Sequence, residues 1–240
     1  MTGDMMYGTI LFDLDGTLLP MVMEEFTNGY FKFLTAKMAA HGYDPKQLID
    51  AIWKGTYAMV KNDRERTNEE VFWECFRGIY GEKALSDSRY FNDFYDHEFN
   101  DAAVFCGYNE LAGECVRKLK ETGHKVILAT NPFFPIFAQK HRCRWAGVDP
   151  DDFAYISSYE NSHYCKPNPK YYLELIEKLS LDPRDCLMVG NDAEEDLAAE
   201  EAGLKVFLLT DCLINTKQKD IAGYPKGGFP ELMQYLQLTE

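Results

Sequence analysis

The chain has 240 residues, of which 46 % are hydrophobic, so it can bury a core large enough for one main domain with a smaller insertion. Its formal net charge of −14 at pH 7 argues against a nucleic-acid partner, because phosphate binding requires clustered Lys and Arg side chains. Seven cysteines without a C-x-x-C pair favour reduced thiols over a disulfide framework or a zinc site. With neither a signal peptide nor a membrane-spanning stretch recognisable, we expect no membrane partner and a cytoplasmic location. The oligomeric state stays open.

The first predicted element is a buried strand over residues 7–12, which leads directly into the sequence DLDGT. In open α/β sheets the ligand crevice lies just past the carboxyl ends of such strands. Asp13 and Asp15 should point to the same side, since residues two apart in an extended segment do. The glycine that follows permits a sharp turn, and Thr17 offers a hydroxyl beside both carboxylates. This pattern predicts a site for chemistry at the end of the strand.

After this motif the pattern becomes helical. Apolar residues at helical spacing predict helices over residues 24–40, 45–61, about 67–79 and 87–99. A capping-box sequence, TNEE, begins the third of them. The aromatic residues of the fourth are interpreted as core packed between helices. We therefore expect residues 20–105 to form a small, separate, all-helical domain.

From residue 109 onward helices and strands alternate. The predicted elements are helix 109–122, strand 125–130, helix 133–145, strand 154–158, helix 169–180, strand 186–190, helix 193–202, strand 205–210, a loop at 223–228 and helix 230–238. Such alternation requires parallel strands joined by right-handed crossovers. The predicted fold class is α/β, a doubly wound parallel sheet formed by residues 1–19 and 106–240, with the helical domain inserted into it.

Some charged residues are interpreted as partners of helix dipoles only. The basic cluster Lys140, His141, Arg142 and Arg144 lies at the end of the predicted helix 133–145. Glu194 and Glu195 lie at the start of the predicted helix 193–202. We expect these residues to have no direct role in a site.

Four segments, taken together, make the chain similar to a known family. The sequence FDLDGTLL is followed by a strand that ends in Thr130, by Lys166 before a proline and a helix, and by the acidic cluster 190–196 after a further strand. In this order the four segments resemble the motifs of the haloacid dehalogenase-like (HAD) hydrolases. The resemblance covers residues 7 to about 210 and implies a Rossmann-like core, with the helical insertion as a cap that closes over the active site.

The resemblance also implies a reaction. It indicates a Mg²⁺-dependent phosphatase that acts on a small phosphorylated metabolite through an aspartyl-phosphate. Asp13 would then be the nucleophile, and Asp15 would protonate the leaving alcohol and activate the hydrolytic water. Thr130 and Lys166 would hold the phosphoryl oxygens and complete the catalytic set. Thr17 and Asn131 are the expected substrate-binding residues.

The metal ligands follow from the same resemblance. Mg²⁺ would be bound by side-chain oxygens of Asp13 and Asp192 and by the backbone carbonyl of Asp15. Many family members have Asp directly after the motif-four glycine, where this chain has Asn191. Either Asn191 or Asp192 therefore provides that ligand, and we favour Asp192 because it is ionised. Asn191 then has a supporting role, and Asp196 supports the site through water or through Lys166.

The same fold also carries other functions. A dehalogenase is disfavoured, since carbon–halogen cleavage has no alkoxide for Asp15 to protonate. A phosphonatase would need a Schiff-base lysine from the cap, and no lysine there has an obviously desolvated setting. A phosphomutase uses the same core and stays open as an alternative. So does a non-catalytic binding or regulatory protein that retains the fold.

Overall fold

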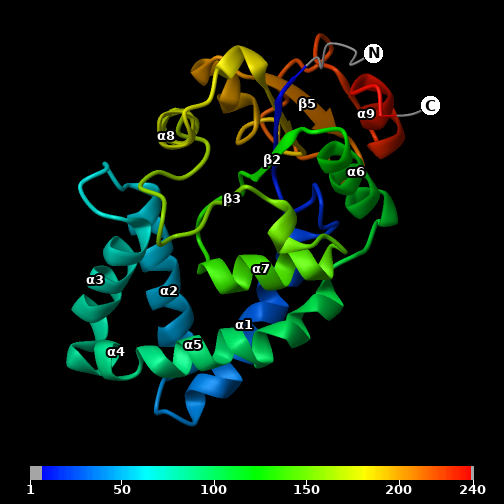
Figure 1. Cartoon of the computed structure of the whole chain (residues 1–240). Helices are drawn as coiled ribbons and strands as arrows, with labels where there is room; N and C mark the ends of the chain where they lie inside the picture. The colour runs from blue at the N-terminus through cyan, green and yellow to red at the C-terminus, as the bar shows by residue number, and fades with distance from the viewer. Residues whose placement is uncertain (1–6, 239–240) are drawn as a thin grey trace.

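The computed structural model describes residues 7–238, and a parallel β-sheet lies at its centre (Figure 1). Within these residues the sheet has six strands in the order β3-β2-β1-β4-β5-β6. The strands are β1 (Thr9–Phe12), β2 (Lys125–Leu128), β3 (Tyr155–Ile156), β4 (Cys186–Gly190), β5 (Lys205–Leu209) and β6 (Lys226–Gly227). The strand order reverses between β1 and β4, and the carboxyl ends of the strands at such a point border the ligand crevice.

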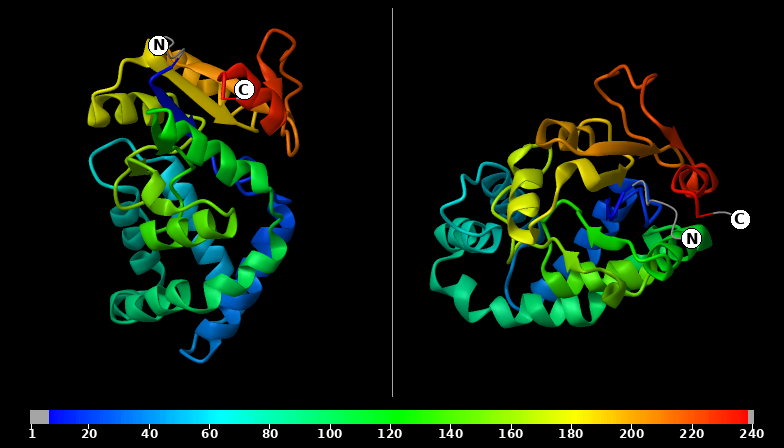
Figure 2. Two further views of the ribbon diagram at one scale, coloured as in Figure 1. Left: turned by 45° about the vertical axis from the view of Figure 1, so that its right-hand side comes forward. Right: turned by 45° about the horizontal axis from the view of Figure 1, so that its top comes forward.

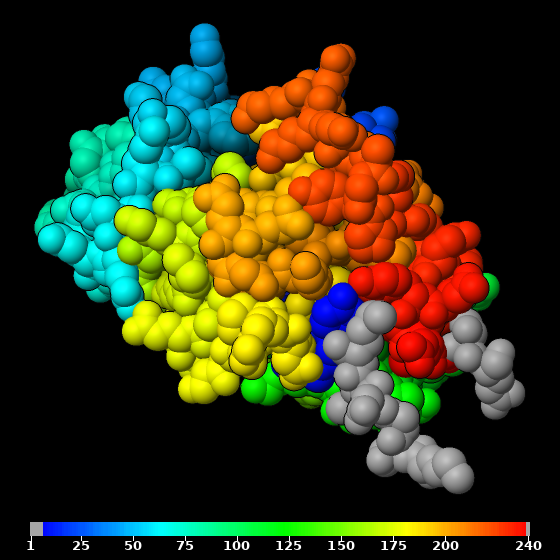
Figure 3. Space-filling model, turned by 90° about the horizontal axis from the view of Figure 1, so that it is seen from above, coloured from blue at the N-terminus to red at the C-terminus, as the bar shows by residue number. Residues whose placement is uncertain are grey.

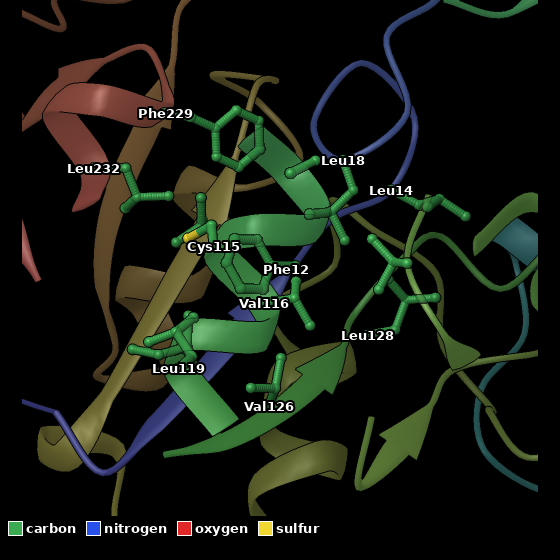
Figure 4. Packing of buried hydrophobic residues seen from close by; sticks show 14 of the residues in the cluster. Phe12, Leu14, Leu18, Cys115, Val116, Leu119, Val126, Leu128, Phe229 and Leu232 are labelled. Atoms are coloured by element: carbon green, nitrogen blue, oxygen red, sulfur yellow. The ribbon is translucent and has the colours of Figure 1, made fainter. Parts of the chain in front are cut away.

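Both faces of the sheet are covered, which is why β1 is buried at every position and apolar from Ile10 to Phe12. Phe12 lies opposite Leu128 of β2 and Val189 of β4. Phe12 packs on the face covered by α6, beside Val116 (Figure 4). Leu11 points to the other face and belongs to the core beneath α8 and the segment that follows β4. Because successive side chains of β1 point to opposite faces of the sheet, the strand contributes to both hydrophobic cores.

Helices lie on both sides of this sheet. They are α6 (Glu110–Glu121), α7 (Ile136–Trp145), α8 (Lys170–Leu179) and α9 (Phe229–Tyr235), with 3₁₀ helices η2 (Pro150–Asp152), η3 (Pro183–Asp185) and η4 (Leu197–Ala202). α6 and α9 contribute to the core on one face, and α8 and η4 to the core on the other. The predicted fold class, a doubly wound α/β sheet, is confirmed.

The segment between β1 and α6 consists of helices joined by turns and short loops and contains no strand. It contains α1 (Met23–Ala39), α2 (Pro45–Val60), α3 (Asn68–Tyr80), α4 (Glu82–Ser86), α5 (Ser88–Asp96) and η1 (Glu98–Phe105). These helices, called here the helical segment, lie together on one side of the sheet with α7 next to them (Figure 2). They share a core that Ala138 of α7 also joins. Among the described residues, no helix is both long and apolar enough to cross a membrane.

Besides its contact with α7, the helical segment is joined to the rest of the chain by backbone hydrogen bonds in two regions. Where the chain leaves and re-enters the sheet, the N–H of Gly107 donates to the carbonyl of Pro20 at 2.6 Å. At the start of α3, the N–H groups of Asn68 and Glu69 donate to carbonyls of Ser162 and Tyr159, each at 2.8 Å. Figure 3 shows this second contact from outside, where the loop between α2 and α3 (cyan) lies against the yellow-green residues near 160. The helical segment is therefore joined to the rest of the chain both where the chain enters and leaves it and at the start of α3.

The predicted helix 87–99 is wrong at its last three residues. α5 ends at Asp96, and His97 leaves the helical region with φ −120° and ψ −83° before η1 begins. Phe94 and Phe99 are both fully buried in the core of the helical segment. In one continuous α-helix, residues five apart would point about 140° away from each other. The break at His97 lets both rings face the same core.

The predicted helix 193–202 is also wrong at its start. Residues 193–196 form turns, and only η4 follows. The side chain of Asp192 accepts the N–H groups of Glu194 and Glu195, and Asp196 accepts the N–H of Asp192. Such local side-chain bonds compete with helical hydrogen bonds. The predicted loop 223–228 likewise contains the short edge strand β6, which pairs with β5.

Candidate active site

Asp13 follows the last residue of β1 and is almost completely buried, with 7 % of its surface exposed. Lys166 donates from Nζ to Asp13 Oδ1 at 2.9 Å and to Asp196 Oδ1 at 2.7 Å. Burial raises the pKa of Asp13 to about 7, against the opposing effect of Lys166. Burial alone would lower the pKa of Lys166, but its two carboxylate partners hold it well above the ordinary range. Asp13, Lys166 and Asp196 therefore form one buried charge cluster.

Thr17 connects the end of β1 to the end of β4. Its hydroxyl lies 2.9 Å from Asn191 Oδ1 and 3.3 Å from Asp13 Oδ2, the two acceptors of this donor. Gly16 turns the chain with φ +80°, and a Cβ at this position would overlap the amide of Asn191. The Asn191 amide nitrogen donates to the carbonyl of Cys212 at 2.8 Å. Both polar atoms of the Asn191 side chain are thus engaged within the protein.

Unlike Asn191, Asp192 has hydrogen-bond partners on only one of its two side-chain polar atoms among the described residues. Its Oδ1 accepts the N–H of Glu194 at 2.7 Å and that of Glu195 at 3.0 Å. Its other carboxylate oxygen has no hydrogen-bond or ion-pair partner in residues 7–238. That oxygen is therefore available to a ligand, whereas the amide oxygen of Asn191 already accepts the hydroxyl of Thr17.

Asp15 forms an ion pair with Arg142 of α7, whose side chain is fully buried. The guanidinium lies 4.8 Å from the ring centre of Phe134 and 5.6 Å from that of Phe26, and donates to Gln139 Oε1 at 2.8 Å. The prediction that Arg142 acts only on the helix dipole is therefore wrong. A buried guanidinium needs a carboxylate partner, but periodicity could not reveal which face of this helix is buried.

Glu195 is the second residue that the sequence reasoning missed. Asn131 donates from Nδ2 to both carboxylate oxygens of Glu195 at 3.0 Å. Burial raises the pKa of Glu195 to about 8. The prediction that Glu195 serves only a helix N-terminus is wrong, because no α-helix begins there and its carboxylate is bound by Asn131. Glu194 pairs instead with Lys217 and lies outside this group.

A cavity of about 350 Å³ brings most of these residues together. Its polar end is lined by Asp13, Asp15, Thr130, Asn131, Asn191, Asp192 and Glu195. Thr17, Lys166 and Asp196 lie behind this wall, each within the hydrogen-bond network around Asp13. The rest of the cavity is lined mainly by aromatic and apolar residues, most of them from the helical segment. Two of the aromatics interpreted as core, Phe91 and Tyr95, are among them.

The polar end of the cavity fits a hard divalent cation. No group of three or more His, Cys, Asp or Glu residues in the described part of the chain has the geometry of a complete metal site. The side chains of Asp13 and Asp192 nevertheless line the same cavity, and one carboxylate oxygen of Asp192 has no hydrogen-bond partner among the described residues. Oxygen donors that leave room for water and substrate are those that Mg²⁺ prefers.

Comparison with known proteins decides the family. The model of the haloacid dehalogenase-like hydrolases matches residues 7–203, which is most of the chain. The chain belongs to this family. The hydrolase predicted from the four motifs is therefore confirmed.

A relative named for its activity agrees with a HAD-like phosphoric monoester hydrolase, and a solved structure agrees with the fold. Phosphoglycolate phosphatase of Vibrio vulnificus is 27 % identical over 207 residues, which cover 84 % of this chain and 82 % of the relative. A structure from Haemophilus somnus, designated by prediction as a phosphoglycolate phosphatase, superimposes with a TM-score of 0.59 at 17 % identity, covering 97 % of this chain and 99 % of that one.

A third HAD-like protein, the hydrolase YfnB of Bacillus subtilis, was solved with magnesium bound. It superimposes with a TM-score of 0.57 at 20 % identity, covering 96 % of this chain and 99 % of that one. At this identity the likeness establishes the shared fold.

Proposed function

We propose that this HAD-like hydrolase is a Mg²⁺-dependent phosphatase that hydrolyses a small phosphate monoester through a phosphoryl group carried on Asp13. The observation that supports it most is the position of Asp13, buried at the end of β1, fixed by Lys166 and open to the cavity. The phosphatase among the matched relatives and the magnesium bound to YfnB support the same reading.

Asp13 acts as the nucleophile in this proposal. One of its oxygens forms the bond to phosphorus while the bond from phosphorus to the ester oxygen breaks. Asp15 gives a proton to that ester oxygen as it leaves. In the second step Asp15 takes a proton from water, the water oxygen attacks phosphorus, and the carboxylate of Asp13 is released with inorganic phosphate.

Residues around Asp13 hold the phosphoryl group in place. Lys166 and the hydroxyl of Thr130 offset its negative charge, and backbone N–H groups near Asn131 donate to its oxygens. The side chains of Asp13 and Asp192 and the carbonyl of Asp15 would hold Mg²⁺, which would supply positive charge to offset that of the carboxylates and the phosphate. The need for such charge is plain, since Asp13, Asp15, Asp192 and Glu195 all line one cavity.

Arg142 positions Asp15 in this scheme. The ion pair with Arg142 and the aromatic rings on either side of the guanidinium fix where the carboxylate of Asp15 lies. Because Arg142 does not line the cavity, it acts through Asp15 and does not touch the substrate.

We further propose that residues 20–105 form a cap domain, with residues 1–19 and 106–240 as the catalytic domain. The helical segment supplies most of the apolar wall of the cavity, so its closure would exclude bulk water from the phosphoryl group. The paired segments at Pro20 and Gly107 would act as the hinge.

The test is hydrolysis of a generic aryl phosphate by the purified protein with and without Mg²⁺. We expect Mg²⁺-dependent turnover that Asp13→Asn reduces by at least about a thousandfold. Asp50→Asn, at an exposed acid of α2, is the matched control and should retain full activity. Turnover by Asp13→Asn within about tenfold of the native protein would contradict the proposal.

A further inference from the structure

The wall of the cavity opposite Asp13 is aromatic. Rings from four different helices of the helical segment line it, among them Phe26 of α1, Trp53 of α2, Trp73 of α3 and Phe91 of α5. Phe72 and Trp73 meet edge to face with ring centres 5.5 Å apart. Trp53 stands in the same way against Phe31 at 5.7 Å and is 51 % exposed. A large apolar ring with half its surface open, beside a cavity, is a surface that a ligand can cover.

The same wall carries no positive charge. Among the described residues that line the cavity there is no Lys, Arg or His. The two cations closest to the chemistry are already paired, Lys166 with Asp13 and Asp196, and Arg142 with Asp15. Phe26 and Phe134 line the cavity and lie over the guanidinium of Arg142. Neither cation is therefore free to pair with a second anionic group of a substrate.

An anionic leaving group would be unfavourable in such a cavity. It would exchange water for aromatic rings, and none of the described residues that line the cavity carries a positive charge to pair with it. Phosphoglycolate, the substrate named for the matched relative, has a carboxylate close to its ester oxygen. The wall of this cavity offers that carboxylate no partner, although neutral hydroxyls such as those of Thr27 and Thr56 are present.

The size of the cavity also limits the size of the substrate. Its volume of about 350 Å³ lies at the lower end of the roughly 300–1,000 Å³ found for small-ligand sites. We propose that the substrate is a small phosphate monoester of an uncharged aromatic or similarly apolar alcohol, whose leaving group packs among Trp53, Phe72 and Trp73. This inference rests on the proposed phosphatase activity, because it names the alcohol part of the ester that Asp13 would attack.

Two esters that differ by one para carboxylate test the inference, and 4-carbamoylbenzyl phosphate, an uncharged ester of matching size, is the control for the added volume. Benzyl phosphate and 4-carboxybenzyl phosphate have similar leaving alcohols, since a methylene group separates the ring from the ester oxygen. We expect kcat/KM for benzyl phosphate to exceed that for 4-carboxybenzyl phosphate, and that for phosphoglycolate, by at least about tenfold, or about 1.4 kcal/mol. An equal or higher value for either carboxylate ester would overturn the inference while the phosphatase activity stands.

A substitution in the aromatic wall tests whether the wall itself determines the preference for the uncharged ester. Trp53→Lys places a cation at the mouth of the cavity, at a position exposed enough to accept it, and should reduce the preference for benzyl phosphate several-fold. Tyr57→Lys, one turn along α2, 63 % exposed and outside the cavity, is the matched control and should leave the preference unchanged. An equal change in both variants, or no change in Trp53→Lys, would contradict a specificity role for this wall. If no ester is hydrolysed, 4-nitrophenyl phosphate included, the phosphatase proposal itself fails and the inference falls with it.

Discussion

Arg142 shows how much of the chemistry depends on one buried side chain. Replacing it with Gln removes the ion-pair partner of Asp15, whose own side chain is partly exposed at the cavity. We expect Arg142→Gln to lower stability by about 1–3 kcal/mol, less than for a fully buried pair, because Asp15 keeps contact with solvent. We also expect it to lower kcat about 10- to 100-fold, since Asp15 is no longer held where it protonates the leaving group.

Leaving-group chemistry separates this role from a purely structural one. A nitrophenolate leaves without much help from an acid, whereas an alkoxide does not. The loss in Arg142→Gln should therefore be larger for benzyl phosphate than for 4-nitrophenyl phosphate. Arg144→Gln, at an exposed position of the same helix, should leave both rates unchanged. Equal losses on the two esters would show that Arg142 supports the fold alone.

Asp192 and Asn191 differ in what the structure leaves available to a metal. Asp192 has one carboxylate oxygen without a partner, whereas the amide of Asn191 is bonded to Thr17 and Cys212. We expect Asp192→Ala to raise the Mg²⁺ concentration for half-maximal activity at least about tenfold, and more than Asn191→Ala does. Titration of Mg²⁺ against the two variants measures this. A larger increase for Asn191→Ala would assign the ligand to Asn191.

At the scale of elements, the end of β4 is the tightest point of the site. Gly190 is its last residue, and a Cβ there would overlap the carboxylate of Asp196, which is paired with Lys166. We expect Gly190→Ala to cost about 1–3 kcal/mol and to lower kcat, because Asp196 must move away from Lys166. Gly78→Ala in α3, where a Cβ meets no atom within 4 Å, should leave kcat unchanged and stabilise the helix by about 0.5–1 kcal/mol. Urea unfolding with parallel kcat measurements decides between these outcomes.

The elements that carry the site were largely predictable from sequence. The strand before Asp13 ends in a continuous apolar run. The four motif segments can be recognised in the sequence, and three of them follow predicted strands. The turns after β4 were not predictable, because bonds from the side chains of Asp192 and Asp196 determine them. The burial of Arg142 and Glu195 could not be predicted either, since it depends on packing between segments distant in sequence.

At the scale of the whole molecule, the attachment of the helical segment matters most. If it is a cap, its contact at the start of α3 must open and close, and the amides of Asn68 and Glu69 report on this directly. We expect these amides to exchange with deuterium faster than those of β1, and to slow when Asp13→Asn binds benzyl phosphate and Mg²⁺. Exchange as slow as in β1, with or without ligand, would mean that the helical segment is a rigid part of one domain.

The central claim is that Asp13 carries the phosphoryl group during turnover. The direct measurement is mass spectrometry of the peptide containing Asp13 after rapid acid quenching of the protein during hydrolysis of 4-nitrophenyl phosphate with Mg²⁺. We predict a mass increase of one phosphoryl group located on Asp13 in the native protein, and its absence in Asp13→Asn. A phosphoryl group on another residue, or full turnover by Asp13→Asn with none on the peptide, would contradict the account.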